Sequence, residues 1–382
     1  MRALWWWWFI PFAGGCLWDR GDAAGGAVIQ DVTIFQGPAV PLVADSQLVQ
    51  GRTAPVLAGR PGRIVAHVGF EQGSEVRDIA VRFHLGAHEL TATGTMPAGA
   101  TPVEVFVDFD ASDLDVTATF SAEVVEQHGF TSNHDVLAGQ RLPATGAWPL
   151  DARQAPRFRV EVVPLTTHDG LVTVTQADLD RWQANLYAFL PVSGVDITLG
   201  AGLSTPTTAN RDQDWGIVLG LVAARRAAEG LPPDTFMYAA VPSAPQAAIG
   251  GIAPSLTVEN PYWHVAAGQV GGGNIDVESG IVAHELGHAL GRSHAPCGNP
   301  GGPDYGYPYT GAIIGIDGLD LRDNTARDRA QYFDFMSYCH PYFVSDYQFG
   351  ALFDSLTYLA DRGRPAEAPP LFVTDPLPQV RR

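Results

Sequence analysis

The chain has 382 residues, of which 46% are hydrophobic and 17% are charged, with 42 glycines and 29 prolines. Because this length exceeds what one hydrophobic core usually organises, we expect two compact domains rich in strands and turns, and the composition excludes a disordered or low-complexity chain. The formal net charge is −18, with 23 basic residues against 41 acidic ones. Nucleic acid is therefore excluded as the expected partner, because phosphate binding needs clustered lysine and arginine.

The first 16 residues predict an export signal. A basic start at Arg2 precedes an apolar run at 3–12 that is too short to span a bilayer. Small residues then lead directly to Cys16 in a pattern that resembles a bacterial lipobox, so we expect Cys16 to carry a lipid anchor and residues 17–26 to form a tether. Ala13 replaces the usual leucine, which leaves ordinary cleavage open. The expected location is the cell envelope, as a lipoprotein of the outer membrane or cell surface, or outside the cell after secretion.

Residues 27–147 predict an all-β domain. Short runs of valine, isoleucine, phenylalanine and threonine alternate with turns of glycine, proline and aspartate, which is typical of antiparallel strands. Such runs are found at 27–29, 63–68, 79–84 and 103–107. We expect an immunoglobulin-like β-sandwich in this region.

Residues 148–382 predict a mixed domain of the α/β (α+β) kind. Beyond a loop rich in proline, glycine and alanine near Trp148, strand and helix patterns alternate. Thr175 is predicted to cap a helix that runs to Leu190. A second helix is expected at 214–229, and strands are expected at 157–163, 195–199 and 235–241. The expected fold class is a multidomain chain with an all-β domain followed by this mixed domain.

Residues 284–294 are the most informative segment and read H-E-L-G-H-A-L-G-R-S-H. They fit the pattern H-E-x-x-H-x-x-G-x-x-H at every fixed position. Residues four apart lie on one face of a helix, so His284 and His288 can present both imidazoles to one ion. Gly291 can adopt the left-handed conformation that ends the helix and turns the chain back toward His294, the third expected metal ligand.

Glu285 is the expected general base. Three nitrogen ligands leave a fourth zinc position open for water, and the metal lowers the pKa of that water toward about 7. Because Glu285 adjoins the first ligand, its carboxylate can reach the water and accept its proton. The sequence therefore predicts one catalytic Zn²⁺ ion and hydrolysis at a carbonyl carbon.

This motif and a later methionine turn resemble those of the metzincins, zinc peptidases in which a methionine lies beneath the metal site. Met336 is followed by Ser337 and Tyr338, which is the sequence of this turn in serralysin-like members. The resemblance covers roughly residues 157–360 and implies that Met336 underlies the histidines without binding zinc. It also implies a catalytic role for Tyr338, because the corresponding tyrosine of astacin-like and serralysin-like enzymes binds zinc at rest and supports the transition state. An ordinary core tyrosine is the alternative.

Cys297 and Cys339 lie three residues after His294 and three after Met336. With Cys16 assigned to the lipid, they remain as an even pair in an oxidising compartment, which predicts one disulfide. Two buried free thiols are the alternative. The surrounding residues also resemble a group of exported bacterial metzincins that carry β-sandwich domains, some of them related to mucin-cleaving enzymes.

Two runs of aspartate are candidate Ca²⁺ sites. Neither run has the spacing of a known calcium loop, so solvated turns are the alternative. The runs comprise Asp108, Asp110, Asp113 and Asp115 in the first domain, and Asp317, Asp320 and Asp323 in the second.

Residues 250–253 lie upstream of the motif, where the resemblance implies an edge strand that pairs with extended substrate. Backbone pairing would give sequence-tolerant binding. A plain turn is the alternative.

The expected function is that of a zinc-dependent endopeptidase that acts on extracellular proteins or glycoproteins. The rival is a surface adhesin or glycan-binding lipoprotein in which the β domain binds the partner and the zinc site is structural or vestigial. Glu285 argues for the enzyme, because a purely structural site does not need a general base. Hydrolysis of a non-peptide amide also stays open.

Overall fold

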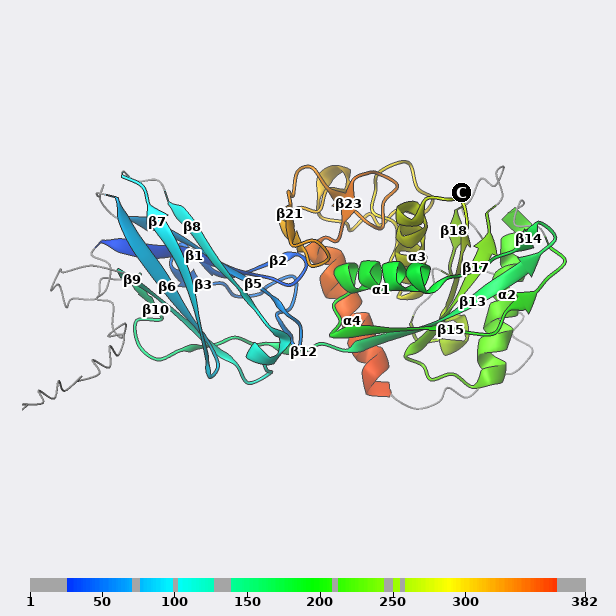
Figure 1. Ribbon diagram of the computed structural model, residues 1–382, viewed down its shortest axis with the longest axis horizontal. Coiled ribbons are helices and arrows are strands. Elements are labelled where there is room, and N and C mark those ends of the chain that lie inside the picture. The colour runs from blue at the N-terminus through cyan, green and yellow to red at the C-terminus, as the bar shows by residue number, and fades with distance from the viewer. Residues whose placement is uncertain are drawn as a thin grey trace, which may run out of the picture.

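The computed structural model describes residues 26–70, 76–98, 102–126, 139–207, 212–243, 250–254 and 258–362. The chain is an α+β protein with several sheets, in agreement with the coarse fold class predicted from the sequence. An all-strand region and a helix-containing region lie at opposite ends of the long axis (Figure 1). The predicted export signal, Cys16 and residues 17–25 of the predicted tether lie outside the described residues.

Two antiparallel sheets form the N-terminal region. The first has the strand order β3-β2-β1-β5-β8, and the second has the order β10-β9-β6-β7 with β11 also paired to β9. Ile29 and Ile34 of the first sheet and Val81 and Phe83 of the second are fully buried in one hydrophobic cluster. All four strand runs predicted in this region lie within observed strands. The strands are β1 (Ala27–Phe35), β2 (Ala39–Ala44), β3 (Gln47–Leu48), β5 (Gly62–Phe70), β6 (Arg77–Leu85), β7 (His88–Met96), β8 (Val103–Phe109), β9 (Thr119–Glu126), β10 (Arg141–Leu142) and β11 (Trp148–Pro149).

The pairing of the N-terminal strands continues past residue 147, where the sequence placed the boundary. Trp148 pairs with Phe120 of β9. Farther on, β12 (Arg153–Gln154) pairs in parallel with β4 (Leu57–Ala58). Two-residue strands carry no hydrophobic periodicity, so the sequence pattern does not reveal them.

A mixed sheet with the order β14-β13-β17-β19-β18 forms the second region. Its main strands are parallel, and β18 is an antiparallel strand at the edge. The strands predicted at 157–163, 195–199 and 235–241 are confirmed, and residues 250–253 contain β18. The strands are β13 (Arg157–Thr167), β14 (Gly170–Leu171), β15 (Gly194–Leu199), β16 (Leu203–Ser204), β17 (Thr235–Pro242), β18 (Gly251–Ile252) and β19 (Val265–Val270).

Helices cover both faces of this sheet. The helices are α1 (Gln176–Phe189), α2 (Asp212–Glu229), α3 (Ile275–Ala289) and α4 (Asp346–Arg362). Alternate side chains of β17 separate two cores: Phe236 and Tyr238 lie in the cluster of α1 and α3, whereas Met237 and Ala239 lie in the cluster of α2. Thr175 caps α1 as predicted, because its side chain accepts a hydrogen bond from the backbone of the first turn.

The remaining short elements lie in loops, and those that follow α3 connect it to α4. They are η1 (Ala111–Asp113), η2 (Pro261–Trp263), η3 (Thr310–Ala312), β20 (Gly318–Asp320), β21 (Thr325–Arg327), β22 (Phe333–Asp334) and β23 (Tyr342–Phe343).

The two regions share backbone pairing and one core. Pro38 and Gly318 form an antiparallel bridge. Beside it, the Leu319 amide donates to the Gly37 carbonyl at 2.8 Å. The larger hydrophobic cluster includes residues of the N-terminal sheets, α1, α3 and α4. The N-terminal region is therefore packed against the second region and is not attached by a linker alone.

No helix in the described part of the chain is long and apolar enough to cross a membrane.

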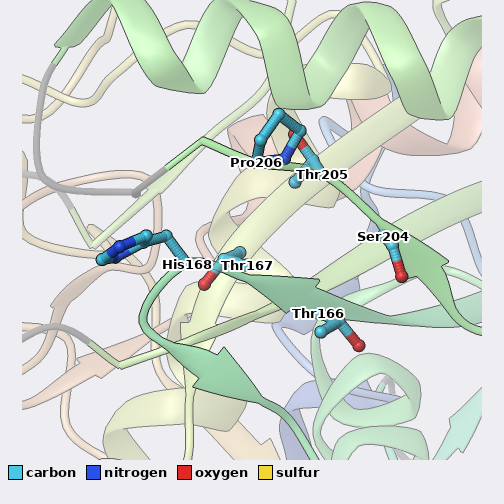
Figure 2. Close-up of a pocket in the computed structure, with 6 residues that line it drawn as sticks. All are labelled: Thr166, Thr167, His168, Ser204, Thr205 and Pro206. Atoms are coloured by element: carbon cyan, nitrogen blue, oxygen red, sulfur yellow. The ribbon is translucent and has the colours of Figure 1, made fainter.

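A surface hollow of about 340 Å³ lies at the ends of β13 and β16 (Figure 2). Two of its hydroxyl groups bond locally: Thr205 Oγ1 lies 2.9 Å from Thr207 Oγ1, and the Asp169 amide donates to Thr167 Oγ1 at 3.1 Å. The hollow includes none of the histidines of the zinc-binding pattern. It is lined by Thr166, Thr167, His168, Ser204, Thr205 and Pro206.

Candidate metal centre

Helix α3 carries the first part of the motif. Asn274 caps it by accepting a hydrogen bond from the Val277 amide at 3.3 Å. Its apolar side, which includes Val282 and Leu286, is buried against the sheet. Gly291 follows the helix with φ of 85°, the left-handed conformation that its place in the motif predicted.

The three predicted histidine ligands meet at one point. Their nearest ring nitrogens lie within 4.8 Å of one another, so His284, His288 and His294 can hold a metal ion. His288 Nε2 lies 3.0 Å from His294 Nε2. Two nitrogens bound at about 2.0 Å to a tetrahedral zinc ion are separated by about 3.3 Å, which is close to this spacing.

Each histidine is oriented by a backbone carbonyl. The Nδ1 atoms of His284, His288 and His294 donate to the carbonyl oxygens of Phe335 at 2.9 Å, Arg292 at 2.6 Å and Gly301 at 2.7 Å. Because a carbonyl can only accept, Nδ1 carries the proton and Nε2 keeps its lone pair. The Nε2 lone pairs of His288 and His294 therefore face each other, an arrangement that repels unless a cation lies between them. This donor set fits a metal ion.

Burial keeps the three imidazoles neutral. It lowers the pKa of His284 to about 4, with a smaller contribution from the neighbouring His294. Burial also lowers the pKa of His288 well below its ordinary value, and that of His294 to a lesser degree. The neutral imidazole is the form that binds a metal ion.

Glu285 lies on α3 beside the first histidine and is 7% exposed. Burial raises the pKa of its carboxyl group to about 8. A bound cation would lower this pKa again, because it favours the charged carboxylate. A buried carboxyl group with a shifted pKa next to a metal site is a candidate acid or base.

Met336 lies beneath the helix that carries the histidines. It is fully buried, and a methyl group placed on Gly287 would lie 2.5 Å from its sulfur. The turn is held by Asp334, which accepts hydrogen bonds from the Met336 amide at 2.8 Å and the Ser345 amide at 3.0 Å. Burial raises the pKa of Asp334 to about 6. Asp334 was not predicted as a site residue, although its place two residues before the methionine is a usable signal.

Tyr338 lies beside the histidines. Its ring centre is 5.0 Å from that of His294 and 5.8 Å from that of His284, and the side chain is 52% exposed. Partial burial and the nearby Glu285 carboxylate raise the pKa of its phenol. The phenol is therefore protonated at neutral pH and can donate a hydrogen bond.

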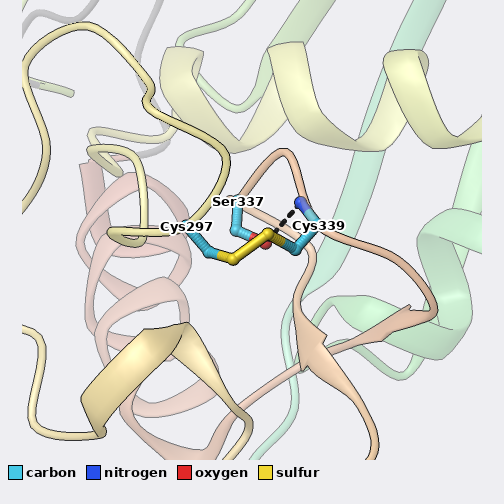
Figure 3. The surroundings of a disulfide bond; sticks show 3 residues. All are labelled: Cys297, Ser337 and Cys339. Carbon is cyan, nitrogen blue, oxygen red and sulfur yellow. Dashed lines mark hydrogen bonds between the residues drawn. A yellow bond between two sulfur atoms is a disulfide. The ribbon is translucent and has the colours of Figure 1, made fainter.

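A disulfide joins Cys297 to Cys339, as predicted (Figure 3). Two backbone hydrogen bonds run beside it: the Ala295 amide donates to the Met336 carbonyl, and the Tyr338 amide donates to the Cys297 carbonyl, each at 3.0 Å. The loop after the third histidine is thus fixed to the methionine turn by both covalent and hydrogen bonds.

Aspartates of both runs form hydrogen bonds or ion pairs with arginine side chains. Asp320 is fully buried and accepts hydrogen bonds from Arg322 and Arg327. Asp108 pairs with Arg63 at 2.7 Å. In the part of the chain that the structure describes, the three histidines are the one group of three or more ligand side chains placed to hold a metal ion. The described residues of these runs therefore form hydrogen-bonded turns, with no group of three or more acidic side chains placed to hold an ion.

No protein-family model and no curated protein matches the chain. One match among solved structures is described as a chaperone-substrate complex, with a TM-score of 0.30 and 10% sequence identity. The match covers 68% of this chain and 39% of that chain, so this chain spans about two fifths of that structure's length. A likeness at this level carries no argument about fold or function.

Proposed function

We propose that this chain is a zinc-dependent endopeptidase of the metzincin kind, with Glu285 as general base. The proposal rests on one arrangement: three histidines gather with their Nδ1 atoms all held by backbone carbonyls, and the residue that follows the first of them on α3, Glu285, carries a buried carboxyl group. A structural zinc site is closed by four protein ligands, whereas the described residues offer three. An open metal position beside a general base is what hydrolysis requires.

The chain's own residues supply the rest of the proposed mechanism. His284, His288 and His294 would hold the metal, and a bound zinc ion would supply a Lewis acid that polarises a peptide carbonyl and lowers the pKa of water. Glu285 accepts a proton from the attacking water and returns it to the leaving amine. Tyr338 donates a hydrogen bond to the oxygen on which negative charge develops.

The edge strand β18 supports binding of an extended peptide. Among the described residues it pairs with β19 alone, so its other edge is available to a substrate strand. Backbone pairing depends little on side chains, which suits an endopeptidase for proteins or glycoproteins. We place the substrate along this edge.

We further propose that the N-terminal sheets form an immunoglobulin-like sandwich and that the protein is exported. The two antiparallel sheets around one core support the sandwich. The apolar run before Cys16 and the disulfide support an oxidising exported compartment, with or without a lipid on Cys16.

The test combines metal analysis with cleavage assays on the wild type and on Glu285→Gln. Zinc content is measured by elemental analysis, and cleavage is measured on denatured casein and on a mucin-type glycoprotein. We expect one zinc ion per chain in both proteins and cleavage by the wild type alone. Cleavage by Glu285→Gln at the wild-type rate contradicts the role of Glu285. Zinc in both proteins without any cleavage favours the adhesin or glycan-binding alternative.

A further inference from the structure

Two glycines face each other where the edge of the mixed sheet rests on α3. Gly251 of β18 is paired with Gly268 of β19. Helix α3 presents Ile281 and Glu285 to this pair, and these two residues lie on one helix face because they are four apart. The backbone of the edge strand therefore lies directly against the proposed general base.

Gly251 leaves no room for a side chain. A methyl group on its Cα would lie 2.7 Å from Glu285 Cγ, 2.8 Å from Glu285 Oε1 and 2.8 Å from Ile281 Cγ2. Carbon atoms in favourable contact are about 3.5–4.0 Å apart, so such a methyl group would force the carboxyl group or the strand to move. Gly251 does not have a left-handed backbone. The missing side chain, and not backbone freedom, is therefore what this position requires.

Gly268 makes room in the same way on the next strand. A methyl group there would overlap the hydroxyl of Tyr238 and would lie 2.7 Å from Ile281 Cγ2. Tyr238 is fully buried, and its hydroxyl has no hydrogen-bond partner among the described residues. The glycine pair thus lets α3 approach the sheet closely over both Ile281 and Glu285.

We propose that Gly251 is a positioning residue for Glu285: its lack of a side chain lets the edge strand close over the carboxyl group and hold it toward the metal centre. This inference rests on the proposed function. It assigns to the glycine a role that neither the metal motif nor backbone pairing with substrate requires. The contact is with Glu285 itself, whereas the three histidines are held by carbonyls elsewhere.

An alanine at position 251 can relieve the overlap in two ways. Glu285 can turn away from Gly251, or β18 can lift away from α3. The first movement displaces the carboxyl group, and the second removes the strand that holds it, so in both cases the group loses the fixed position that proton transfer needs. Metal binding should survive, because no contact of a histidine with its carbonyl partner involves Gly251.

Gly250 provides the matched control. A methyl group on Gly250 would meet the flexible end of Ile281, at 3.2 Å from Cδ1, and no atom of Glu285. For Gly251→Ala we expect kcat on a casein-derived peptide to fall about 100-fold or more with KM changed less than about threefold. Gly250 belongs to the edge along which we place the substrate, so Gly250→Ala can raise KM, but it leaves Glu285 untouched and its kcat should fall much less than that of Gly251→Ala. Both variants should retain one zinc ion per chain.

Two results overturn the inference when the wild type is active. One is a Gly251→Ala kcat above about one third of the wild-type value. The other is an equal loss in both glycine variants, which would assign the effect to the folding of β18. A double variant sharpens the test: adding Gly251→Ala to Glu285→Gln should lower the residual rate by less than about threefold, because the methyl group acts through the carboxyl group.

A spectroscopic measurement separates this inference from the proposed function. In cobalt-substituted protein, the visible absorption of Co²⁺ reports the groups around the open metal position. If the wild type cleaves neither substrate, the proposed function has failed, and the cobalt spectrum alone then tests whether Gly251 positions Glu285. Gly251→Ala should move the spectrum in the same direction as Glu285→Gln, and Gly250→Ala should not. A spectrum that Gly251→Ala leaves unchanged overturns the positioning role.

Discussion

Arg60 Nη1 donates a hydrogen bond to the Leu190 carbonyl at 2.8 Å and thereby joins the N-terminal region to the end of α1. The same guanidinium donates to the carbonyl oxygens of Val192 and Tyr187, each at 2.7 Å, and of Gln36 at 2.8 Å. The last carbonyls of a helix lack partners within it, and a cation is favourable at that end. Burial lowers the pKa of Arg60 to about 10, so the side chain is charged at neutral pH.

This contact continues toward the metal centre. Phe189, the last residue of α1, stacks on Phe335 with ring centres 5.2 Å apart. The Phe335 carbonyl accepts the hydrogen bond from His284 Nδ1 at 2.9 Å. The N-terminal region therefore supports a predicted metal ligand through α1.

Replacing Arg60 with methionine should strongly destabilise the protein. The change removes a donor from four carbonyl oxygens, of which that of Leu190 keeps a second donor in the Val192 amide, and we expect a loss of about 3 kcal/mol or more in the free energy of unfolding. Arg181→Met is the control, since Arg181 pairs with Asp276 at the surface, and it should cost less than about 1 kcal/mol. Urea denaturation of both variants measures the difference. Similar losses in the two would contradict a special role for Arg60.

Deleting residues 27–155 should abolish folding of the remaining chain. The deletion uncovers core residues of α4 such as Phe349 and removes Pro38, which bridges to Gly318. We therefore expect insoluble protein and equal loss of activity on a short peptide and on a large glycoprotein. Soluble protein that cleaves the peptide normally and the glycoprotein poorly would instead make the N-terminal region a substrate-binding module.

Sequence patterns predicted those parts of the structure in which spacing determines geometry. The helical repeat brings His284 and His288 to one face, and the left-handed Gly291 follows from the need to turn the chain back. The carbonyl partners of the histidines could not be predicted, because any residue has a carbonyl group and only the fold brings Phe335 or Gly301 to the site.

The contacts between the two regions could not be predicted either, because only the fold brings their residues together. A single arginine such as Arg60 has no pattern that separates it from surface arginines, and β11 and β12 are too short to show periodicity. The contact between Gly251 and Glu285 was also hidden, because a glycine needed for close approach looks like a turn glycine in sequence.

Replacing Cys297 and Cys339 together with serine should lower both stability and metal affinity. The chain-entropy model gives a loss of about 4 kcal/mol for a loop that spans 42 residues of sequence separation. We expect zinc affinity to fall about tenfold, because the bridge fixes the loop of His294 to the methionine turn. Urea denaturation and zinc competition with a chelator measure the two effects. Dithiothreitol should reproduce them in the wild type and leave the double variant unchanged; a wild type insensitive to reduction would contradict the prediction.

Zinc should be retained well below the pH at which exposed histidines release it. Burial lowers the pKa of His284 to about 4 and lowers those of His288 and His294, so protons compete for the ligand nitrogens only in more acidic solution. In the metal-free protein the same shifts act on stability. The contribution of these histidines to stability is complete above pH ~6.5, where they are neutral in the folded and unfolded states alike. It declines as the pH falls from ~6.5 toward ~4, because the unfolded chain takes up protons first.

Because protons compete for the ligand nitrogens only in acidic solution, we expect half-release of zinc below pH ~5.5, measured by dialysis at stepped pH with elemental analysis and circular dichroism. The chelator-treated protein serves as the control and should lose stability over the window from pH ~6.5 to ~4. Half-release near pH ~6.5 would mean that the three imidazoles titrate as exposed groups, which contradicts the lowering of their pKa values by burial.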